Sequence, residues 1–356
     1  MVQSRTQAEN ARSLVAAPAS PWPHRVAVLL VCATFPLIWV GGLVTTYDAG
    51  MAVPDWPNTF GYNLFLYPWQ TWIAGPWDLF IEHGHRLFGA TVGMLTILFV
   101  VTTFLGEQRR WVRMASLGAL ALVIAQGALG GLRVVLDERL LAQLHGCVGP
   151  AFFAYTVALA VWTSPRWTSK QWWAGPDQSQ ELARGRASAR FQRIAFLTVA
   201  IAYLQLVLGS QLRHVRPVVD VTVFRAAVWL HLFMAAALTV HVIMLAARAT
   251  RWFFADRFIF VPAVALAGLL IVQLALGVGA WVVNYGWPEA LFGNYPWAQQ
   301  FVVMQAGRLQ AWVTTGHVAT GSLILATSLL IALRSLLLPA GQSRVVRSVV
   351  AVGVLA

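Results

Sequence analysis

Residues 82–105, EHGHRLFGATVGMLTILFVVTTFL, join an ionisable segment, Glu82 to Arg86, to a long apolar run that begins at Leu87. A run of about 20 apolar residues is long enough to cross a bilayer as a helix. If the helix begins by Glu82, a spacing of three residues places Glu82 and His85 on one face. Gly89 and Gly93 continue that face along the helix. The pattern predicts a strip without side chains that admits a flat group.

The composition of the whole chain indicates an integral membrane protein. Of its 356 residues, 58% are hydrophobic and 11% are charged, and the mean hydropathy is +0.66. Segments with the length and apolar character of membrane spans lie at roughly 26–46, 87–105, 112–133, 141–163, 190–211, 226–247, 258–284 and 310–333. We therefore expect an all-α integral membrane protein with eight transmembrane helices.

The net charge of +12 follows the predicted topology and does not indicate a nucleic-acid partner. The loop of residues 47–81 contains Asp48, Asp55 and Asp78 but no Lys or Arg, whereas most of the 25 basic residues fall in the N-terminal segment and in alternate loops. By the positive-inside rule, both termini are expected in the cytoplasm, with the protein in the inner or plasma membrane. The aromatic-rich loop 47–81 is long enough to lie over the outer surface as a lid.

A motif recurs near the outer ends of the odd-numbered spans. It reads Leu37-x-x-x-Gly41, Gln126-x-x-x-Gly130, Gln205-x-x-x-Gly209 and Gln273-x-x-x-Gly277. Gln and Gly one turn apart also occur in ordinary membrane-helix packing, but the recurrence favours two repeated four-helix bundles. The expected organisation is a cytoplasmic tail (1–25), an N-terminal bundle (26–163), a cytoplasmic linker (164–189), a C-terminal bundle (190–335) and a C-terminal tail (336–356).

Four of the eight histidines lie near the outer ends of the even-numbered spans: His85, His145, His231 and His317. The residue one turn further along each span is small: Gly89, Gly149, Ala235 and Gly321. The remaining histidines have larger residues there: Val28, Leu87, Val218 and Leu245. Imidazole is a standard axial ligand of haem iron, and a porphyrin held this way would collide with a large side chain on the neighbouring turn. The sequence therefore predicts a two-histidine haem site in the core of each bundle.

Copper or zinc is the alternative to haem, because histidine also binds those metals. The aromatic, weakly charged surroundings and the glycines favour a large planar ligand. Cys147 lies two residues after His145, but a buried free cysteine more often packs as a small hydrophobe. We expect His24 and His214 at the membrane interface, His83 pointing away from His85, and His241 packed against a polar neighbour.

Several arginines occur at outer ends, against the inward bias of the other basic residues: Arg86, Arg133, Arg213, Arg225 and Arg308. Haem propionates are anionic and need cationic partners near the membrane surface. We expect Arg86, Arg225 and Arg308 to be such partners. Simple snorkelling of the side chain towards water is the alternative.

Taken together, these motifs resemble the haem A synthase family, membrane enzymes that oxidise the C8 methyl of haem O to the formyl group of haem A for terminal oxidases. The resemblance covers all eight spans and rests on Gly41-Gly42, the loop from Ala49 to Pro57, Glu82-x-x-His85-Arg86, the Gln126–Gly130 motif and the single outer histidines at 145, 231 and 317.

The resemblance implies roles for these residues. His231 and His317 would ligate a haem b cofactor, His85 and His145 would bind the substrate haem O, and Glu82 with His85 would form the catalytic site. It also implies an electron acceptor or donor in the membrane, with haem O synthase and the assembly of terminal oxidases as the wider context. Many bacterial members carry a cysteine pair in the first outer loop. That loop has no cysteine here, so a thiol-dependent step cannot use it.

The pattern around Glu82 allows two roles. Glu82 could accept or relay a proton, or form an ion pair with Arg86 at i+4.

Two other classes of protein are alternatives to the enzyme. A non-catalytic di-haem electron carrier would share the four histidines but would not need Glu82. A transporter would place polar groups near the bilayer midplane, which only the glutamines of the odd-numbered spans approach.

Overall fold

A computed structural model describes residues 20–169, 181–287, 297–302 and 307–338. Its long helices are α2 (Trp22–Thr46), α4 (Trp77–Gly106), α5 (Arg110–Val135), α6 (Arg139–Thr163), α8 (Glu181–Arg213), α9 (Val221–Phe253), α10 (Arg257–Tyr285) and α11 (Arg308–Ser335). Short helical segments are α3 (Trp69–Ile73), α7 (Pro165–Thr168) and η3 (Trp297–Gln300). Among the described residues, eight helices are long and apolar enough to cross a membrane. Within the described ranges the chain has no β-strand apart from an isolated bridge between Thr59 and Tyr62, which confirms the all-α prediction.

The second span begins earlier than its apolar run. Helix α4 starts at Trp77, directly after Pro76, rather than near Leu87. Asp78 stands in its first turn, where a carboxylate interacts favourably with the helix dipole. Glu82 to Arg86 therefore lie inside the helix, and the condition for Glu82 and His85 to share a face is met.

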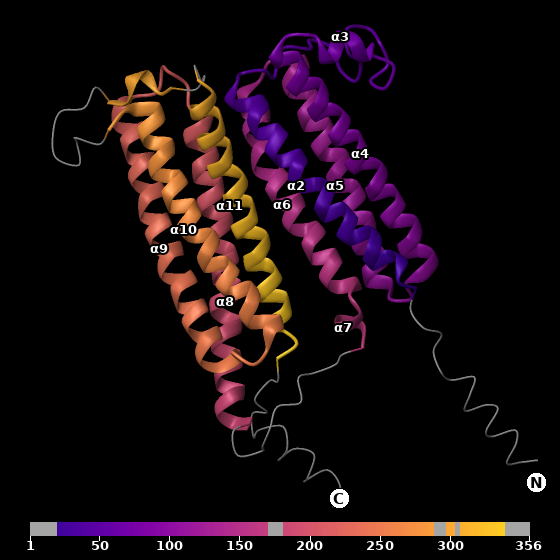
Figure 1. Ribbon diagram of the computed structural model, residues 1–356, viewed down its shortest axis with the longest axis vertical. Coiled ribbons are helices and arrows are strands. Elements are labelled where there is room, and N and C mark those ends of the chain that lie inside the picture. The colour runs from indigo at the N-terminus through magenta and orange to yellow at the C-terminus, as the bar shows by residue number, and fades with distance from the viewer. Residues whose placement is uncertain (1–19, 170–180, 288–296, 303–306, 339–356) are drawn as a thin grey trace, which may run out of the picture.

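The eight long helices form two four-helix bundles that lie side by side (Figure 1). One bundle contains α2, α4, α5 and α6, and the other contains α8, α9, α10 and α11. Helix α11 packs against both α2 and α6 of the first bundle. Figure 1 also distinguishes two ends of the molecule. We call the end that carries α3 the loop end and the opposite end the tail end.

The closely packed apolar side chains concentrate in the tail-end half of each bundle. In the first bundle they include Leu30, Phe99 and Leu159, and in the second they include Phe191 and Ile331. On α10 the buried positions run from Ile259 to Leu270, although the helix continues to Tyr285. The loop-end halves, where the four histidines lie, contain smaller clusters of buried apolar residues, around Ile81 in the first bundle and Phe224 in the second.

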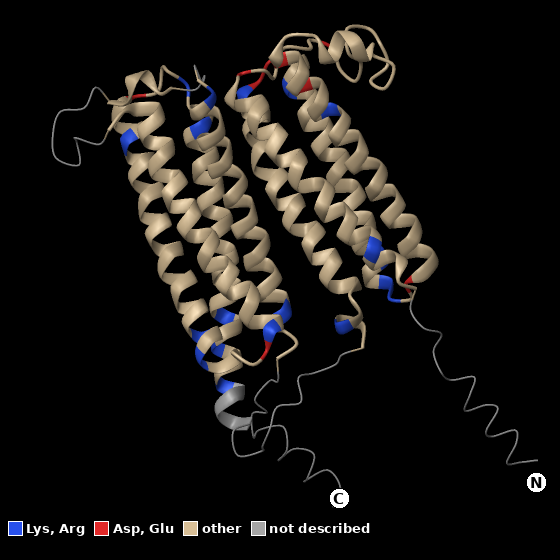
Figure 2. Ribbon diagram, in the orientation of Figure 1, with Lys and Arg blue, Asp and Glu red and all other residues tan. Residues whose placement is uncertain are grey.

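A polar contact joins the two bundles near the loop end. Arg213 of α8 donates a hydrogen bond of 2.6 Å to the carbonyl oxygen of Gly42 and another to Oγ1 of Thr46, both on α2. Oγ1 of Thr46 also lies 3.0 Å from Oγ1 of Thr315 on α11. Basic residues occur at both ends of the helices and are rare between them (Figure 2).

Candidate functional site

Each bundle brings two of the predicted histidines together. The ring centres of His85 on α4 and His145 on α6 are 6.2 Å apart, with the ring planes at 82°. Those of His231 on α9 and His317 on α11 are 6.4 Å apart, with the planes at 65°. The two pairs therefore have nearly the same spacing at equivalent positions of the two bundles.

This spacing fits two imidazoles on opposite sides of one metal ion. Metal–nitrogen bonds of about 2.0 Å on each side place the two ring centres roughly 6 Å apart. Each pair offers two nitrogen ligands, which suits the axial positions of a haem iron. In the described parts of the chain, no three His, Cys, Asp or Glu side chains cluster as they would around a metal ion. Zinc sites usually take three or four protein ligands, so the donor set favours haem over zinc.

A glycine of the preceding helix supports the ring of each histidine. A Cβ atom on Gly41 would lie 2.8 Å from Cε1 of His85, and one on Gly130 would lie 3.1 Å from Cε1 of His145. In the second bundle, a Cβ atom on Gly209 would lie 3.2 Å from Cε1 of His231, and one on Gly277 would lie 3.0 Å from Cε1 of His317. The recurring glycine of the odd-numbered spans thus sets how closely each imidazole approaches its neighbouring helix.

Backbone carbonyl groups orient two of these rings. Nδ1 of His145 lies 3.1 Å from the carbonyl oxygen of Gln126, and Nδ1 of His317 lies 3.2 Å from that of Gln273. A carbonyl oxygen only accepts hydrogen bonds, so Nδ1 is the donor in both cases. The opposite nitrogen, Nε2, then carries the lone pair that a metal ion can use.

The glutamine side chains differ between the two bundles. The amide nitrogens of Gln205 and Gln273 lie 3.2 Å and 3.4 Å from Nε2 of His231 and His317. That of Gln126 instead donates to the backbone carbonyl of His145. Metal binding at Nε2 would therefore require these two amides of the second bundle to turn away.

The strip of small residues beside His85 is open, as its sequence predicts. A Cβ atom on Gly89 or Gly93 would meet no heavy atom within 4 Å. At the matching positions, Gly149 lies against the amide of Gln126 and Gly321 against that of Gln273. Of the three glycines that follow a paired histidine by one turn, Gly89 is therefore the one with unobstructed space beside it.

Glu82 is buried at the loop end of α4, with 1% of its surface exposed. Its Oε1 accepts a hydrogen bond of 2.8 Å from Arg86, so the ion pair considered from the sequence is present. Its Oε2 accepts one of 2.9 Å from the backbone amide of Val53. Glu82 thus joins α4 to the first loop.

Arg86 strengthens the same connection through its guanidinium group. Nη1 donates to the carbonyl oxygens of Asp55 (2.7 Å) and Asn58 (2.9 Å), and Nη2 donates to that of Val53 (2.8 Å). The segment 53–58 is therefore fixed over the loop end of α4. This agrees with the expectation that the loop lies over the outer surface as a lid. The contacts of Glu82 and Arg86 with the loop could not be read from their local pattern, because they join residues distant in sequence.

The other histidines belong to neither pair, although His214 lies close to Gly146, the neighbour of His145. His83 is buried beneath the loop, where its Nδ1 lies 3.1 Å from Oγ1 of Thr59 and its ring packs against Tyr67 and Trp72. His24, His214 and His241 place Nδ1 against the carbonyl oxygens of Ala160, Ser210 and Ala237, respectively. The carbonyl partner of His241 belongs to its own helix, α9. Cys147 is buried and Cys32 is exposed, and neither is in a disulfide.

The outer arginines have different environments. Arg225 stacks over Trp297, with its Cζ 4.7 Å from the ring centre, and Arg308 is exposed at the start of α11. Arg213 is bonded across the bundle interface. Arg133 lies against the loop at Gly50, and its buried Nε has no hydrogen-bond partner among the described residues.

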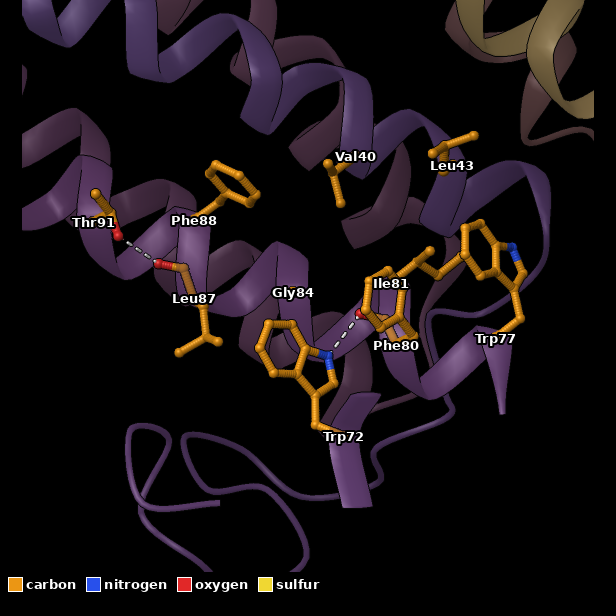
Figure 3. A pocket seen from close by; sticks show the side chains of 10 residues that line it. All are labelled: Val40, Leu43, Trp72, Trp77, Phe80, Ile81, Gly84, Leu87, Phe88 and Thr91. Carbon is orange, nitrogen blue, oxygen red and sulfur yellow. Dashed lines mark hydrogen bonds between the residues drawn. The ribbon is translucent and has the colours of Figure 1, made fainter. Parts of the chain in front are cut away.

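A separate apolar pocket opens between α2 and α4, with a volume of about 320 Å³. Its walls include Val40, Leu43, Trp72, Trp77, Phe80 and Phe88 (Figure 3). The indole nitrogen of Trp72 donates 3.0 Å to the carbonyl oxygen of Phe80, which holds α3 over the pocket. None of the paired histidines lines it, so the pocket is distinct from the histidine sites.

The fold and the sites together define a multi-pass membrane protein with two half-buried histidine pairs. Residues 76–228 match the family described as COX15-CtaA, cytochrome oxidase assembly protein. This match confirms the family resemblance that the sequence motifs carry. The matched segment is somewhat less than half of the chain. It includes Glu82, His85 and His145 and ends before His231. No curated protein matches the chain.

Proposed function

We propose that this protein is a haem A synthase, which oxidises the C8 methyl group of haem O to the formyl group of haem A. The observation that carries the proposal is the asymmetry between two matching histidine pairs. Both pairs have the spacing of axial ligands, but only the pair in the first bundle has a buried carboxylate, Glu82, one turn from a ligand and open glycines beside it. The second pair is then a site for a resident cofactor, and the first is the substrate site.

In this proposal His231 and His317 hold haem b through their Nε2 atoms. The bound haem b supplies one-electron chemistry that no protein side chain provides. Gly209 and Gly277 fix the positions of the two imidazoles, and the carbonyl of Gln273 orients His317. A membrane electron acceptor or donor completes the redox balance, and the product serves the assembly of terminal oxidases.

His85 and His145 hold the substrate haem O, and Glu82 holds or moves a proton beside it. The carboxylate is withdrawn from water and bonded to Arg86 and the Val53 amide, so its position is fixed. The loop segment 53–58 keeps water away from that end of the site. The distribution of basic residues supports a cytoplasmic location for both tails and an outer position for the histidine pairs.

The direct test is to express the chain in a host that makes haem O but not haem A, then extract the haems and determine their masses. A formyl haem supports the synthase. Haem b alone, at unchanged mass, would favour the alternative, a non-catalytic di-haem electron carrier.

Glu82→Gln tests the carboxylate in the same host. We expect haem b to be retained and haem O, or a partly oxidised alcohol, to accumulate. Because Glu82 also holds the loop, Arg86→Gln is the matched control, since it removes loop contacts and leaves the carboxylate. Equal losses in the two variants would reduce Glu82 to a structural role, and normal haem A output from Glu82→Gln would exclude the proton-handling role.

A further inference from the structure

Arg133 is a half-buried cation beside the first histidine pair. It lies in the last turn of α5, about one turn beyond Gly130, which supports the ring of His145. Its Nε is buried without a hydrogen-bond partner among the described residues. A buried donor that lacks a partner destabilises the structure, and more so when it belongs to a charged group. Arg133 is therefore suited to an anionic partner that the protein itself does not supply.

The first loop brings its backbone against this guanidinium group. A Cβ atom on Gly50 would lie 3.1 Å from Nη2 of Arg133 and even closer to Nη1, so a larger residue there would displace the arginine. The indole of Trp56 packs just as closely against Gly131, on the same turn of α5. The loop thus confines Arg133 to the space above the His85–His145 pair.

The neighbouring cation, Arg86, is differently placed. Its two terminal nitrogens already donate to Glu82 and to three carbonyl oxygens of the loop. Arg213, another half-buried arginine at this end, donates to Gly42 and Thr46. Among the described arginines around the first histidine pair, Arg133 is the one with a buried guanidinium nitrogen left to donate.

We propose that Arg133 binds a propionate carboxylate of the substrate haem. This inference rests on the proposed function, because it takes the first histidine pair as the substrate site. Arginine matches a carboxylate with two parallel charge-assisted hydrogen bonds. That contact would fix the rotation of the porphyrin in its plane and so decide which edge faces Glu82. Arg133 is in this sense a positioning residue.

The experiment compares two haems that differ only in their carboxylates. The full-length protein with its resident haem is purified into nanodiscs of zwitterionic lipid and titrated with iron protoporphyrin IX and with its dimethyl ester, and binding is followed by the Soret difference spectrum. For the wild type we expect the free acid to bind about 10-fold more tightly than the ester, which corresponds to one charge-assisted contact. Arg133→Gln should lose this preference, and Arg133→Lys should keep part of it.

Arg139→Gln is the matched control, because Arg139 is an exposed arginine at the same end and should leave the preference unchanged. The inference fails if Arg133→Gln keeps the preference, or if it weakens binding of acid and ester equally, as a structural defect would. It also fails if the variant differs from the wild type only in nanodiscs with anionic lipid, because the partner is then a lipid phosphate.

The haem masses from the expression host separate this inference from the proposed function. A lost preference without any haem A formation would leave Arg133 as a carboxylate site and overturn the synthase. Normal haem A formation with an unchanged preference would overturn the role of Arg133 alone.

Discussion

The backbone amide of Val53 donates a hydrogen bond of 2.9 Å to Oε2 of Glu82. The two residues are 29 positions apart in the chain, so this contact makes the first loop and α4 one structural unit. The carboxylate proposed to handle a proton is also the anchor of the segment that covers it. A change in the loop is therefore expected to reach the site, and a change in Glu82 is expected to reach the loop.

We predict that Glu82→Gln and Arg86→Gln both release the loop segment 53–58. Each substitution removes one partner of a buried ion pair, which typically costs about 3–5 kcal/mol. The measurement is hydrogen–deuterium exchange of the loop amides in detergent or nanodiscs. Faster exchange confined to this segment is expected, while the helices remain protected.

Arg139→Gln is the control for this release, because its exposed side chain does not bind the loop. Arg86→Lys adds a second comparison, since lysine keeps the charge but lacks the planar fork that reaches several carbonyls. Unchanged exchange in Glu82→Gln would show that the Val53 contact does not hold the loop.

We predict that Gly277→Ala disturbs the haem of the second bundle. The added Cβ would lie 3.0 Å from Cε1 of His317, so the imidazole must shift by a few tenths of an ångström. Weaker haem retention and an altered reduced absorption spectrum are expected. The control on the same helix is Gly268→Ala, where a Cβ meets nothing within 4 Å. There the substitution should be neutral or stabilise α10 by up to about 1 kcal/mol. Identical spectra for the two variants would contradict the supporting role of Gly277.

The eight spans and the four paired histidines could be predicted from the sequence because each depends on local pattern. Apolar runs of membrane length define the helices, and a histidine followed one turn later by a small residue marks each member of the two pairs. The start of α4 was predicted too late, since Trp77 to Ile81 read as part of an aromatic loop.

The contacts that complete the site were not predictable, because they join residues distant in sequence. The packing of Gly277 on His317 and the bond from Val53 to Glu82 depend on which helices and loops become neighbours. One sequence feature does indicate the role of these glycines. The motif of the first span keeps the glycine, Gly41, although Leu37 replaces the glutamine. It shows that the glycine recurs without the glutamine and so has a role of its own, which the structure identifies as ring support.

We predict an acid-dependent opening of the first loop that depends on Asp55. Partial burial raises the pKa of this carboxyl, but hydrogen bonds of 2.8 Å from the amides of Gly61 and Phe60 outweigh it and hold the pKa below the ordinary value of 3.8. Because the pKa is lowered in the folded protein, the ionised carboxylate stabilises the loop at pH values above the ordinary pKa of aspartate. This contribution is lost as the pH falls through the lowered value.

Limited digestion by pepsin at a series of acid pH values measures this opening. In the wild type, cleavage within residues 55–61 should rise only at pH values below the ordinary pKa of aspartate. The asparagine of Asp55→Asn cannot ionise. Cleavage of this variant within residues 55–61 should therefore be higher than in the wild type and should show no rise at acid pH. A wild-type loop cleaved equally at all these pH values would show that Asp55 does not control it.

We predict that Arg213 raises the reduction potential of the haem proposed for the second bundle. Its partner Thr46 contacts Thr315, two residues before His317, so the charge lies near that ligand position. A positive charge near the iron favours the reduced state, which carries one positive charge fewer. Arg213→Gln should therefore lower the midpoint potential, on the order of tens of millivolts for one charge in a partly buried setting. Arg213→Lys keeps the charge and should keep most of the potential. The control is Arg216→Gln, an exposed arginine three residues further along, which should leave it unchanged. A fall of equal size in the Lys and Gln variants would assign the effect to the lost contacts with Gly42 and Thr46 rather than to the charge.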